Sequence, residues 1–201
     1  RRMKDGRVTD REAEVTLAMI EPAADIATLV GCDLVIEAVF EQRALKAEVT
    51  KRAEPMLDAN GIFASNTSTL PISSLARASA NPAKFIGLHF FSPVDKMRLV
   101  EIIKGEATSP ATLAKAFDYV VAIGKTPIVV NDARGFFTSR VFSTFVREGA
   151  VMLTEGIPAA IIENAGKYAG MPVGPLAVID ETSMSLSLHV IEQTKADLAA
   201  E

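Results

Sequence analysis

The sequence is poor in the residues that build disulfide frameworks and metal sites. Its 201 residues include one cysteine, Cys32, and two histidines that lie a hundred positions apart. A single cysteine excludes an internal disulfide framework and a cysteine-rich zinc site. Because carboxylates would have to supply most ligands of any bound metal, we predict no metal site.

Long apolar runs and a strong charge imbalance are also missing. Charged residues or prolines interrupt every apolar run well before the roughly 20 residues that a transmembrane helix needs, so no membrane span is predicted. Lys and Arg total 21 against 25 Asp and Glu, a net charge of −4, which argues against general nucleic-acid binding. The composition is 49% hydrophobic, which is typical of a water-soluble globular chain with a substantial core.

Short apolar runs alternate with amphipathic segments over the first two thirds of the chain. The apolar runs predict strands at 33–39, 62–65, 85–90, 99–103 and 126–130. The amphipathic segments predict helices at 8–20, 41–57, 71–78 and 109–123, the second of them closed by Asn60-Gly61. Strands that alternate with helices indicate a mostly parallel sheet that is covered on both faces.

The pattern changes after Asn131. No good strand candidate follows, and from Phe136 onward the apolar residues recur at helical spacing. We therefore predict an α/β domain over residues 1–131 and an all-helical domain over residues 132–201.

The α/β part lacks a phosphate-binding loop. No two of its glycines stand two positions apart, so the dinucleotide fingerprint G-x-G-x-x-G is absent, and there is no P-loop. The sequence starts at Arg1 without an initiator methionine and ends inside a helical pattern without a cap. For a nucleotide-binding domain, we expect the first strand and the phosphate loop to lie upstream of Arg1, and the helical domain to be truncated.

A histidine stands inside one of the apolar runs. His89 lies near the end of the strand predicted at 85–90, and eight residues separate that strand from the next. This loop is too short for the crossover that parallel strands require. The two strands are therefore predicted to form an antiparallel hairpin centred on Asp95, which places His89 opposite Glu101 on one face of the sheet.

The predicted pair allows two interpretations. An unpaired carboxylate buried in an apolar run would be unfavourable, so Glu101 needs a partner. A carboxylate beside an imidazole selects its tautomer and stabilises its protonated form, as general-base catalysis by His89 requires. The alternative is a hydrogen-bonded core histidine in a structural ion pair.

Polar residues follow the strand predicted at 62–65. Ligands of doubly wound sheets bind at the carboxyl ends of the strands, so Asn66 and Ser68 are candidates to offer an amide and a hydroxyl to a bound carbonyl or alcohol. Taken alone, Asn-Thr-Ser is also a common turn or helix cap.

The first eleven residues are rich in positive charge, with five basic residues against two acidic ones. The structural interpretation of this segment is a solvated helix. The functional interpretation is attraction of a polyphosphate ligand, with Lys4 and Arg7 as candidate substrate-binding residues.

Four segments of the sequence form a set: DLVIEAVFE at 33–41, ASNTS at 64–68, GLHFFSPV at 87–94 and LVEII at 99–103. In order and spacing they resemble the L-3-hydroxyacyl-CoA dehydrogenase family. The form FFSPVDKM at 90–97 is most similar to the large multifunctional fatty-acid oxidation subunits, which fuse an enoyl-CoA hydratase to this dehydrogenase. The resemblance extends from about residue 1 to the end of the sequence.

The resemblance implies a Rossmann-type doubly wound domain that binds NAD, followed by an all-helical C-terminal domain that closes over an acyl-CoA. By matching motif, His89 corresponds to the family's catalytic base, Glu101 to its partner and Ser68 to the serine that contacts the substrate oxygen. Ser139 stands where the single-function enzymes have an active-site asparagine, a change that we interpret as a subfamily mark.

The resemblance also implies a set of cofactor contacts. Asn66 matches the asparagine near the nicotinamide, and three further residues fall where the family contacts NAD: Ala38, Glu41 and Lys46. The family's glycine loop and its ribose-binding acid are missing from this sequence, so we expect this chain to bind NAD weakly without them.

The activity that the resemblance implies is NAD-dependent oxidation of L-3-hydroxyacyl-CoA to 3-ketoacyl-CoA in fatty-acid β-oxidation. The implied partners are the acyl-CoA substrate and a second copy of the chain or a thiolase subunit, in the cytoplasm. Two alternatives are a non-catalytic acyl-CoA-binding or docking module of a larger complex, and a different NAD-dependent 3-hydroxyacid dehydrogenase. The His–Glu–Ser set disfavours the first alternative, and the His-Phe-Phe-Ser-Pro motif disfavours the second.

Overall fold

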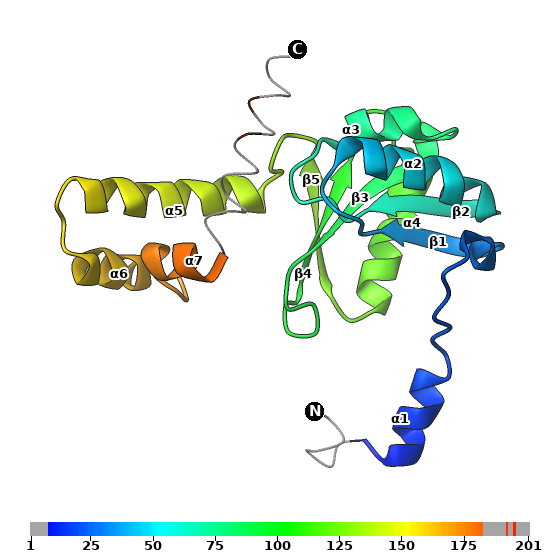
Figure 1. Ribbon diagram of the computed structural model, residues 1–201, viewed down its shortest axis with the longest axis horizontal. Helices are drawn as coiled ribbons and strands as arrows, with labels where there is room; N and C mark the ends of the chain where they lie inside the picture. Colours follow the sequence, from blue (N-terminus) through cyan, green and yellow to red (C-terminus); the bar gives the residue numbers. More distant parts are fainter. Residues whose placement is uncertain (1–7, 183–191, 193–194, 196–201) are drawn as a thin grey trace.

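The computed structural model describes residues 8–182 together with residues 192 and 195 (Figure 1). Within them, a five-stranded sheet has the order β1-β2-β3-β4-β5. The strands are β1 (Cys32–Glu37), β2 (Leu57–Ser65), β3 (Phe85–Phe90), β4 (Leu99–Lys104) and β5 (Thr126–Asn131). All neighbouring strands run parallel except β3 and β4, which are antiparallel. The predicted, mostly parallel sheet is therefore confirmed.

Helices cover both faces of this sheet. They are α2 (Arg43–Ala53), α3 (Ile72–Leu75) and α4 (Pro110–Ala122), with short 3₁₀ turns at Ile26–Leu29, Glu54–Met56, Ala76–Ala78 and Pro82–Lys84. Figure 1 shows α2 and α3 on one face and α4 on the other. Alternate strand residues form an apolar cluster on each face: Phe63 and Phe85 pack with Ile72 of α3, whereas Leu88 and Ile102 pack with the α4 side. This alternation follows from the two-residue period of strand side chains.

The predicted end of the second helix is wrong. Helix α2 ends at Ala53, and β2 already begins at Leu57, so Asn60 and Gly61 lie inside a strand. Pro55 disfavours continued helix. Gly61 does not end a helix but lies where two strands come close together. A Cβ at this position would lie 2.9 Å from the carbonyl oxygen of Cys32. The glycine allows β1 and β2 to approach closely.

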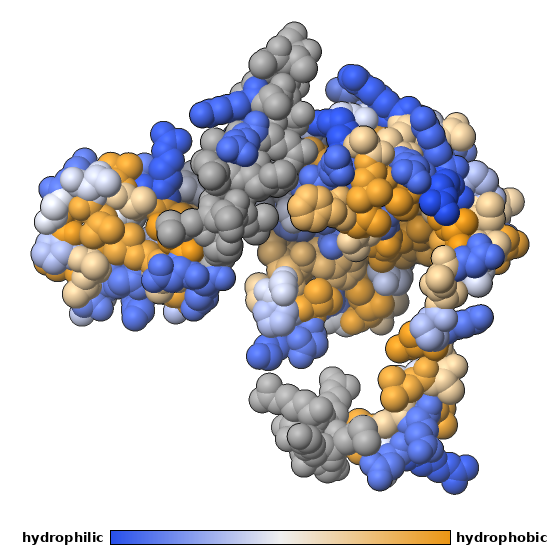
Figure 2. Space-filling model, viewed as in Figure 1, coloured by the Kyte–Doolittle hydropathy of each residue, from blue (hydrophilic) through white to orange (hydrophobic). Residues whose placement is uncertain are grey.

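The first helix is shorter than predicted and lies away from the sheet (Figure 1). Helix α1 (Asp10–Leu17) begins with a capping box, in which the Thr9 hydroxyl accepts from the Glu12 amide and the Glu12 carboxylate accepts from the Thr9 amide. Apolar side chains of α1 and of the segment after it, such as Val15 and Met19, are exposed. Figure 2 shows hydrophobic residues gathered over this part of the chain.

After β5, the described residues contain helices and connecting turns alone: α5 (Thr138–Thr154), α6 (Ala159–Tyr168) and α7 (Pro175–Thr182). The three helices pack on one another beside the sheet (Figure 1). Gly149 and Gly166 both face the ring of Pro175, and the Glu163 carboxylate accepts the amides of Leu176 and Ala177 at the beginning of α7. The predicted fold class, a Rossmann-like sheet followed by helices, is confirmed. None of the described helices is long and apolar enough to cross a membrane.

The packing of α3 on β3 generates a prediction about stability. A Cβ at Gly87 would lie 2.8 Å from Ile72 Cδ1 and 2.9 Å from Ile103 Cβ, and the Ile103 atom cannot move without its strand. Gly87→Ala should therefore lower the free energy of unfolding by about 1–3 kcal/mol through overpacking. Chemical denaturation would measure this change. An unchanged free energy of unfolding would show that the sheet and α3 accommodate the added methyl group.

Candidate active site

The β3–β4 hairpin brings together the central polar pair of the molecule. His89 and Glu101 occupy opposite positions in the antiparallel register, and His89 Nδ1 lies 2.8 Å from Glu101 Oε2. Both residues are buried, His89 to 5% exposure and Glu101 to 0%. The structure therefore pairs the two residues as the loop length predicts.

The Glu101 carboxylate accepts hydrogen bonds at both oxygens. Oε1 accepts the backbone amides of Phe137 at 3.1 Å and Thr138 at 2.9 Å. Oε2 accepts the Thr138 hydroxyl at 2.7 Å in addition to the imidazole. A carboxylate offers about four lone-pair sites, so the acceptor capacity of this buried group is fully used. The amides belong to the beginning of α5, where the positive end of the helix dipole also favours a negative charge.

These contacts decide the protonation state of Glu101. Burial is the largest single influence and by itself would raise the pKa of this carboxyl. The hydrogen bond from His89, the amide and hydroxyl of Thr138 and the charge of a protonated His89 outweigh it, so that the pKa lies below its ordinary value of 4.5. Glu101 is therefore ionised at neutral pH.

His89 lies between two aromatic rings. The ring centroid of Phe91 is 4.4 Å from that of His89, and the ring centroid of Phe136 is 6.0 Å away. Because Glu101 is an ionised acceptor, the hydrogen-bond network assigns the Nδ1–H tautomer to neutral His89. Nε2 is then the unprotonated nitrogen, and it has no hydrogen bond within the described part of the chain. An imidazole held in this way can accept a proton at Nε2.

The turn before α5 adopts an unusual backbone conformation. Gly135 has φ 72° and Phe136 has φ 48°, the latter in the left-handed region that non-glycine residues rarely enter. Phe136 is 2% exposed. Backbone strain of this kind persists where surrounding contacts compensate for it. Here the turn directs the next two amides at Glu101 and places the Phe136 ring against His89.

The loop after β2 is organised by a second carboxylate. Glu41 Oε1 accepts the hydroxyl of Thr67 at 2.6 Å, the amides of Ser68 and Thr69 at 3.0 Å each, and the Thr69 hydroxyl at 3.1 Å. Burial is again the largest influence and would raise the pKa of Glu41, but these donors and the charge of Lys46 lower it below the ordinary value. Glu41 thereby fixes the backbone that carries Ser68, whose side chain is exposed.

Lys46 is among the most deeply buried charged groups that the structure describes. It is 1% exposed, and its Nζ lies 3.1 Å from both carboxylate oxygens of Glu37, 3.3 Å from the carbonyl oxygen of Val39 and 3.4 Å from Glu41 Oε2. The hydroxyl of Ser65 also donates to Glu37. These partners use all three N–H bonds of the ammonium group. A direct contact of Lys46 with NAD stays a prediction, and so does one of Glu41.

Asn66 connects the loop to the histidine strand. Its Oδ1 accepts the amide of Phe90, the residue after His89, at 2.8 Å. The backbone N–H of Asn66 donates to the backbone carbonyl of Glu37 at the end of β1. The side-chain NH₂ of Asn66 has no hydrogen-bond partner among the described residues. The carboxyl ends of β1, β2 and β3 are therefore joined beside His89.

The remaining predicted site residues lie in different environments. Ala38 is exposed just after β1, and Ser139 is half-buried in the first turn of α5. The Ser139 hydroxyl makes no hydrogen bond within the described part of the chain. Lys4 and Arg7 lie outside the described residues. Sequence reasoning missed Thr138, and only the neighbouring Ser139 was singled out by the resemblance.

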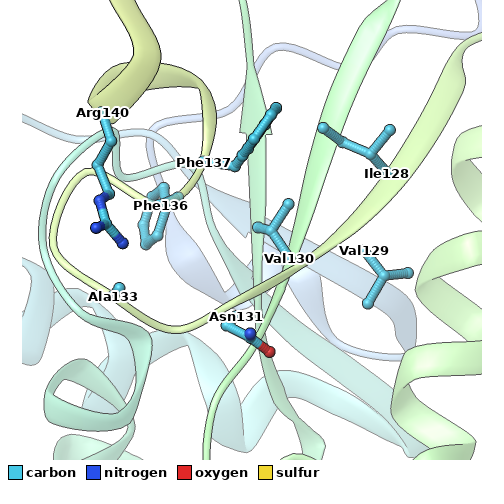
Figure 3. A pocket seen from close by; sticks show the side chains of 8 residues that line it. All are labelled: Ile128, Val129, Val130, Asn131, Ala133, Phe136, Phe137 and Arg140. Atoms are coloured by element: carbon cyan, nitrogen blue, oxygen red, sulfur yellow. The ribbon is translucent and has the colours of Figure 1, made fainter. Parts of the chain in front are cut away.

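A pocket of about 450 Å³ lies where β5 meets the beginning of α5 (Figure 3). Apolar side chains such as Ile128, Val130 and Phe137 line it together with the charged Arg140. Phe136 lines the pocket as well and also contacts the His89 ring. The pocket thus adjoins the His89–Glu101 pair without containing either side chain.

Comparison with known proteins finds a match for both parts of the chain. Residues 1–133 match the profile of the "3-hydroxyacyl-CoA dehydrogenase, NAD binding domain", and residues 135–201 match that of the "3-hydroxyacyl-CoA dehydrogenase, C-terminal domain". The chain belongs to the 3-hydroxyacyl-CoA dehydrogenase family. The first of these profiles is that of an NAD-binding domain, so NAD is the cofactor that belongs to residues 1–133.

The chain spans only part of the length of its relatives. The chain is 38% identical over 188 residues to a fatty acid oxidation complex subunit alpha from Shewanella amazonensis. The aligned region covers 94% of this chain but only 27% of the relative. The solved structure of (S)-3-hydroxybutyryl-CoA dehydrogenase from Ralstonia eutropha is 34% identical, with a TM-score of 0.91 over 98% of this chain and 71% of that one. The 3-hydroxybutyryl-CoA dehydrogenase from Escherichia coli K12 is 31% identical, with a TM-score of 0.88 over 94% of this chain and 40% of that one.

The residues present fit a nicotinamide dinucleotide at the carboxyl ends of the strands, where doubly wound sheets bind such ligands. Glu37 and Ser65 are in register at the ends of β1 and β2. Beyond these two strand ends, Ala38 offers a small exposed side chain and Ser68 an exposed hydroxyl. The NH₂ group of Asn66, without a partner in the described chain, is a further donor at this edge.

The environment of Glu101 predicts a pH-dependent stability difference. Its folded pKa is depressed, so its contribution is fully present above about pH 4.5, the ordinary value, and is lost as the pH falls through the folded value. Glu101→Gln should lower the free energy of unfolding by about 2–4 kcal/mol at pH 7, because an amide cannot accept all four hydrogen bonds. The deficit should shrink as the pH falls below 4.5.

Urea denaturation at several pH values between 7 and 3 checks this expectation. Glu48→Gln is the matched control, since Glu48 is an exposed residue in an ion pair with Arg52 and should change stability by less than about 1 kcal/mol. A deficit of Glu101→Gln that stays constant over the whole range would show that folding does not depress the pKa of Glu101.

A second prediction concerns the loop that carries Ser68. Glu41→Ala removes the acceptor of the Ser68 and Thr69 amides, so these two amides should exchange with deuterium much faster than in the wild type. Amide exchange followed by NMR measures this directly, and Glu48→Ala serves as the control. Unchanged protection at both amides would show that the loop is held without Glu41.

Proposed function

We propose that the chain supplies the catalytic site for NAD-dependent oxidation of L-3-hydroxyacyl-CoA to 3-ketoacyl-CoA, with His89 as the general base. The observation that carries the proposal is the buried His89–Glu101 pair at 2.8 Å, which lies beside the strand ends where the cofactor of a doubly wound domain binds. Family membership supports the reaction class. The acyl-CoA substrate itself is part of the proposal.

In this reaction His89 accepts the proton of the substrate's 3-hydroxyl group at Nε2. The ionised Glu101 stabilises the imidazolium that forms and retains the Nδ1–H tautomer before and after the transfer. When bound, NAD supplies the hydride acceptor. A positioned general base contributes about 10²–10⁴-fold to the rate, so His89 is assigned a substantial share of the catalysis.

Other residues align the substrate. The exposed hydroxyl of Ser68 is proposed to hold the 3-oxygen, on a loop that Glu41 keeps in place. Asn66 is proposed to lie near the nicotinamide, and Ala38 to allow its close approach. Ser139 is proposed to take the place of the asparagine found in the single-function enzymes.

The wider assembly is also proposed. The chain spans about a quarter of the length of its curated relative, whose name identifies a fatty acid oxidation complex. We infer a role in fatty-acid β-oxidation in the cytoplasm, with a thiolase subunit or a second copy of the chain as partner. Lys4 and Arg7 are proposed to attract the CoA phosphates, and the two domains are proposed to divide near residue 132.

Substitution of the base tests this function. In the full-length protein, His89→Gln should lower the turnover of an L-3-hydroxyacyl-CoA by about 10²-fold or more, because glutamine cannot accept the proton. NADH formation measured by absorbance gives the rate, and circular dichroism confirms the fold.

Glu101→Gln should also lower turnover, since it removes the charge that favours the imidazolium. Near-normal turnover of His89→Gln would identify His89 as a core residue, and the chain would then fit the non-catalytic, acyl-CoA-binding alternative.

A further inference from the structure

The Thr138 hydroxyl makes a contact that its position in a helix does not require. Thr138 is the first residue of α5, and a threonine hydroxyl in a helix ordinarily bonds a carbonyl one turn back. Thr144 of the same helix does so with the carbonyl of Arg140, at 2.9 Å. Thr138 instead donates to Glu101 Oε2 on β4, 37 positions away in sequence, at 2.7 Å.

The oxygen that accepts this hydroxyl is the one that holds the imidazole. Oε2 receives both His89 Nδ1 at 2.8 Å and Thr138 Oγ1 at 2.7 Å, while Oε1 receives the two amides. Without the hydroxyl, Oε2 would be held by the imidazole alone, and the terminal torsion of a carboxylate is soft. The hydroxyl on the second oxygen fixes that rotation, and the direction in which Oε2 faces the imidazole is fixed with it.

The backbone just before α5 adopts an unusual conformation that brings Thr138 to Glu101. Phe136 has a left-handed φ of 48°, and this conformation precedes both the amides and the hydroxyl that meet Glu101. The turn therefore directs three donors, the Phe137 amide and the amide and hydroxyl of Thr138, at one buried carboxylate. Ser139, one residue further along, makes no hydrogen bond with its hydroxyl in the described part of the chain.

We propose that Thr138 is a positioning residue for the catalytic pair, which acts through Glu101 to hold His89 in the productive orientation and tautomer. This inference rests on the proposed function, because it assigns Thr138 a role in that same proton transfer. Thr138 acts through Glu101 and not by contact with the substrate. Its removal should slow the chemical step and leave substrate binding almost unchanged.

Three variants of the full-length protein separate this role from a structural one. Thr138→Val keeps the shape and the backbone amide but removes the hydroxyl. Thr138→Ser restores the hydroxyl. Thr144→Val is the matched control, since it is the same substitution at a threonine of the same helix whose hydroxyl bonds locally.

The kinetic result expected is a split between kcat and KM. Thr138→Val should lower kcat about tenfold, the effect of losing a hydrogen bond to a charged group, while KM for the acyl-CoA stays within about twofold of the wild type. Thr138→Ser should recover most of kcat, and Thr144→Val should match the wild type. A wild-type kcat in Thr138→Val, or failure of Thr138→Ser to recover it, overturns the proposal.

A spectroscopic measurement keeps the two proposals distinguishable. In the same full-length protein, a His89→Gln variant identifies the Nδ1 proton resonance of His89, because this variant alone lacks it. Loss of the hydroxyl from Oε2 should shift or broaden this resonance in Thr138→Val but not in Thr144→Val. If the wild type shows no turnover, the proposed function is wrong. An unchanged Nδ1 resonance in Thr138→Val then overturns the role of Thr138 as well.

Discussion

The structure depends on one buried carboxylate, that of Glu101, whose hydrogen bonds join the sheet to the helices that follow it. Glu101 lies on the central hairpin of the sheet, yet two of its hydrogen bonds come from the backbone at the beginning of α5. A buried charge is stable only when its acceptor sites are used, and residues on both sides of the domain junction are needed for that. The same contacts that satisfy Glu101 therefore join the helical part to the sheet and orient His89.

Similar carboxylates hold other parts of the chain in place. Asp132 accepts the amides of Ile72 and Ser73 at 2.7 Å each, which fixes the beginning of α3 near the domain junction. Glu41 fixes the loop after β2, and Glu163 the beginning of α7. An acceptor carboxylate satisfies several backbone donors that packing would otherwise leave unpaired. Precise placement of loops thus comes from charge-assisted hydrogen bonds as well as from apolar burial.

The His89 environment combines apolar walls with a single charged partner. Phe91 and Phe136 flank the ring, which limits water around it and strengthens its interaction with Glu101. One wall comes from the hairpin loop and the other from the turn before α5. A movement of the helical part would therefore change both the hydrogen bonding of Glu101 and the enclosure of His89. The junction between sheet and helices is where binding and proton transfer are expected to meet.

The sequence by itself determined the order of strands and helices, the change to helices after Asn131 and the pairing of His89 with Glu101. These features depend on local periodicity and on one loop too short for a crossover, and both can be read along the chain. Only the tertiary structure showed that Asn60 and Gly61 lie in a strand, where β1 approaches closely, and that Thr138 shares the carboxylate with His89. Contacts between residues dozens of positions apart are decided by how layers pack, and no local pattern encodes them.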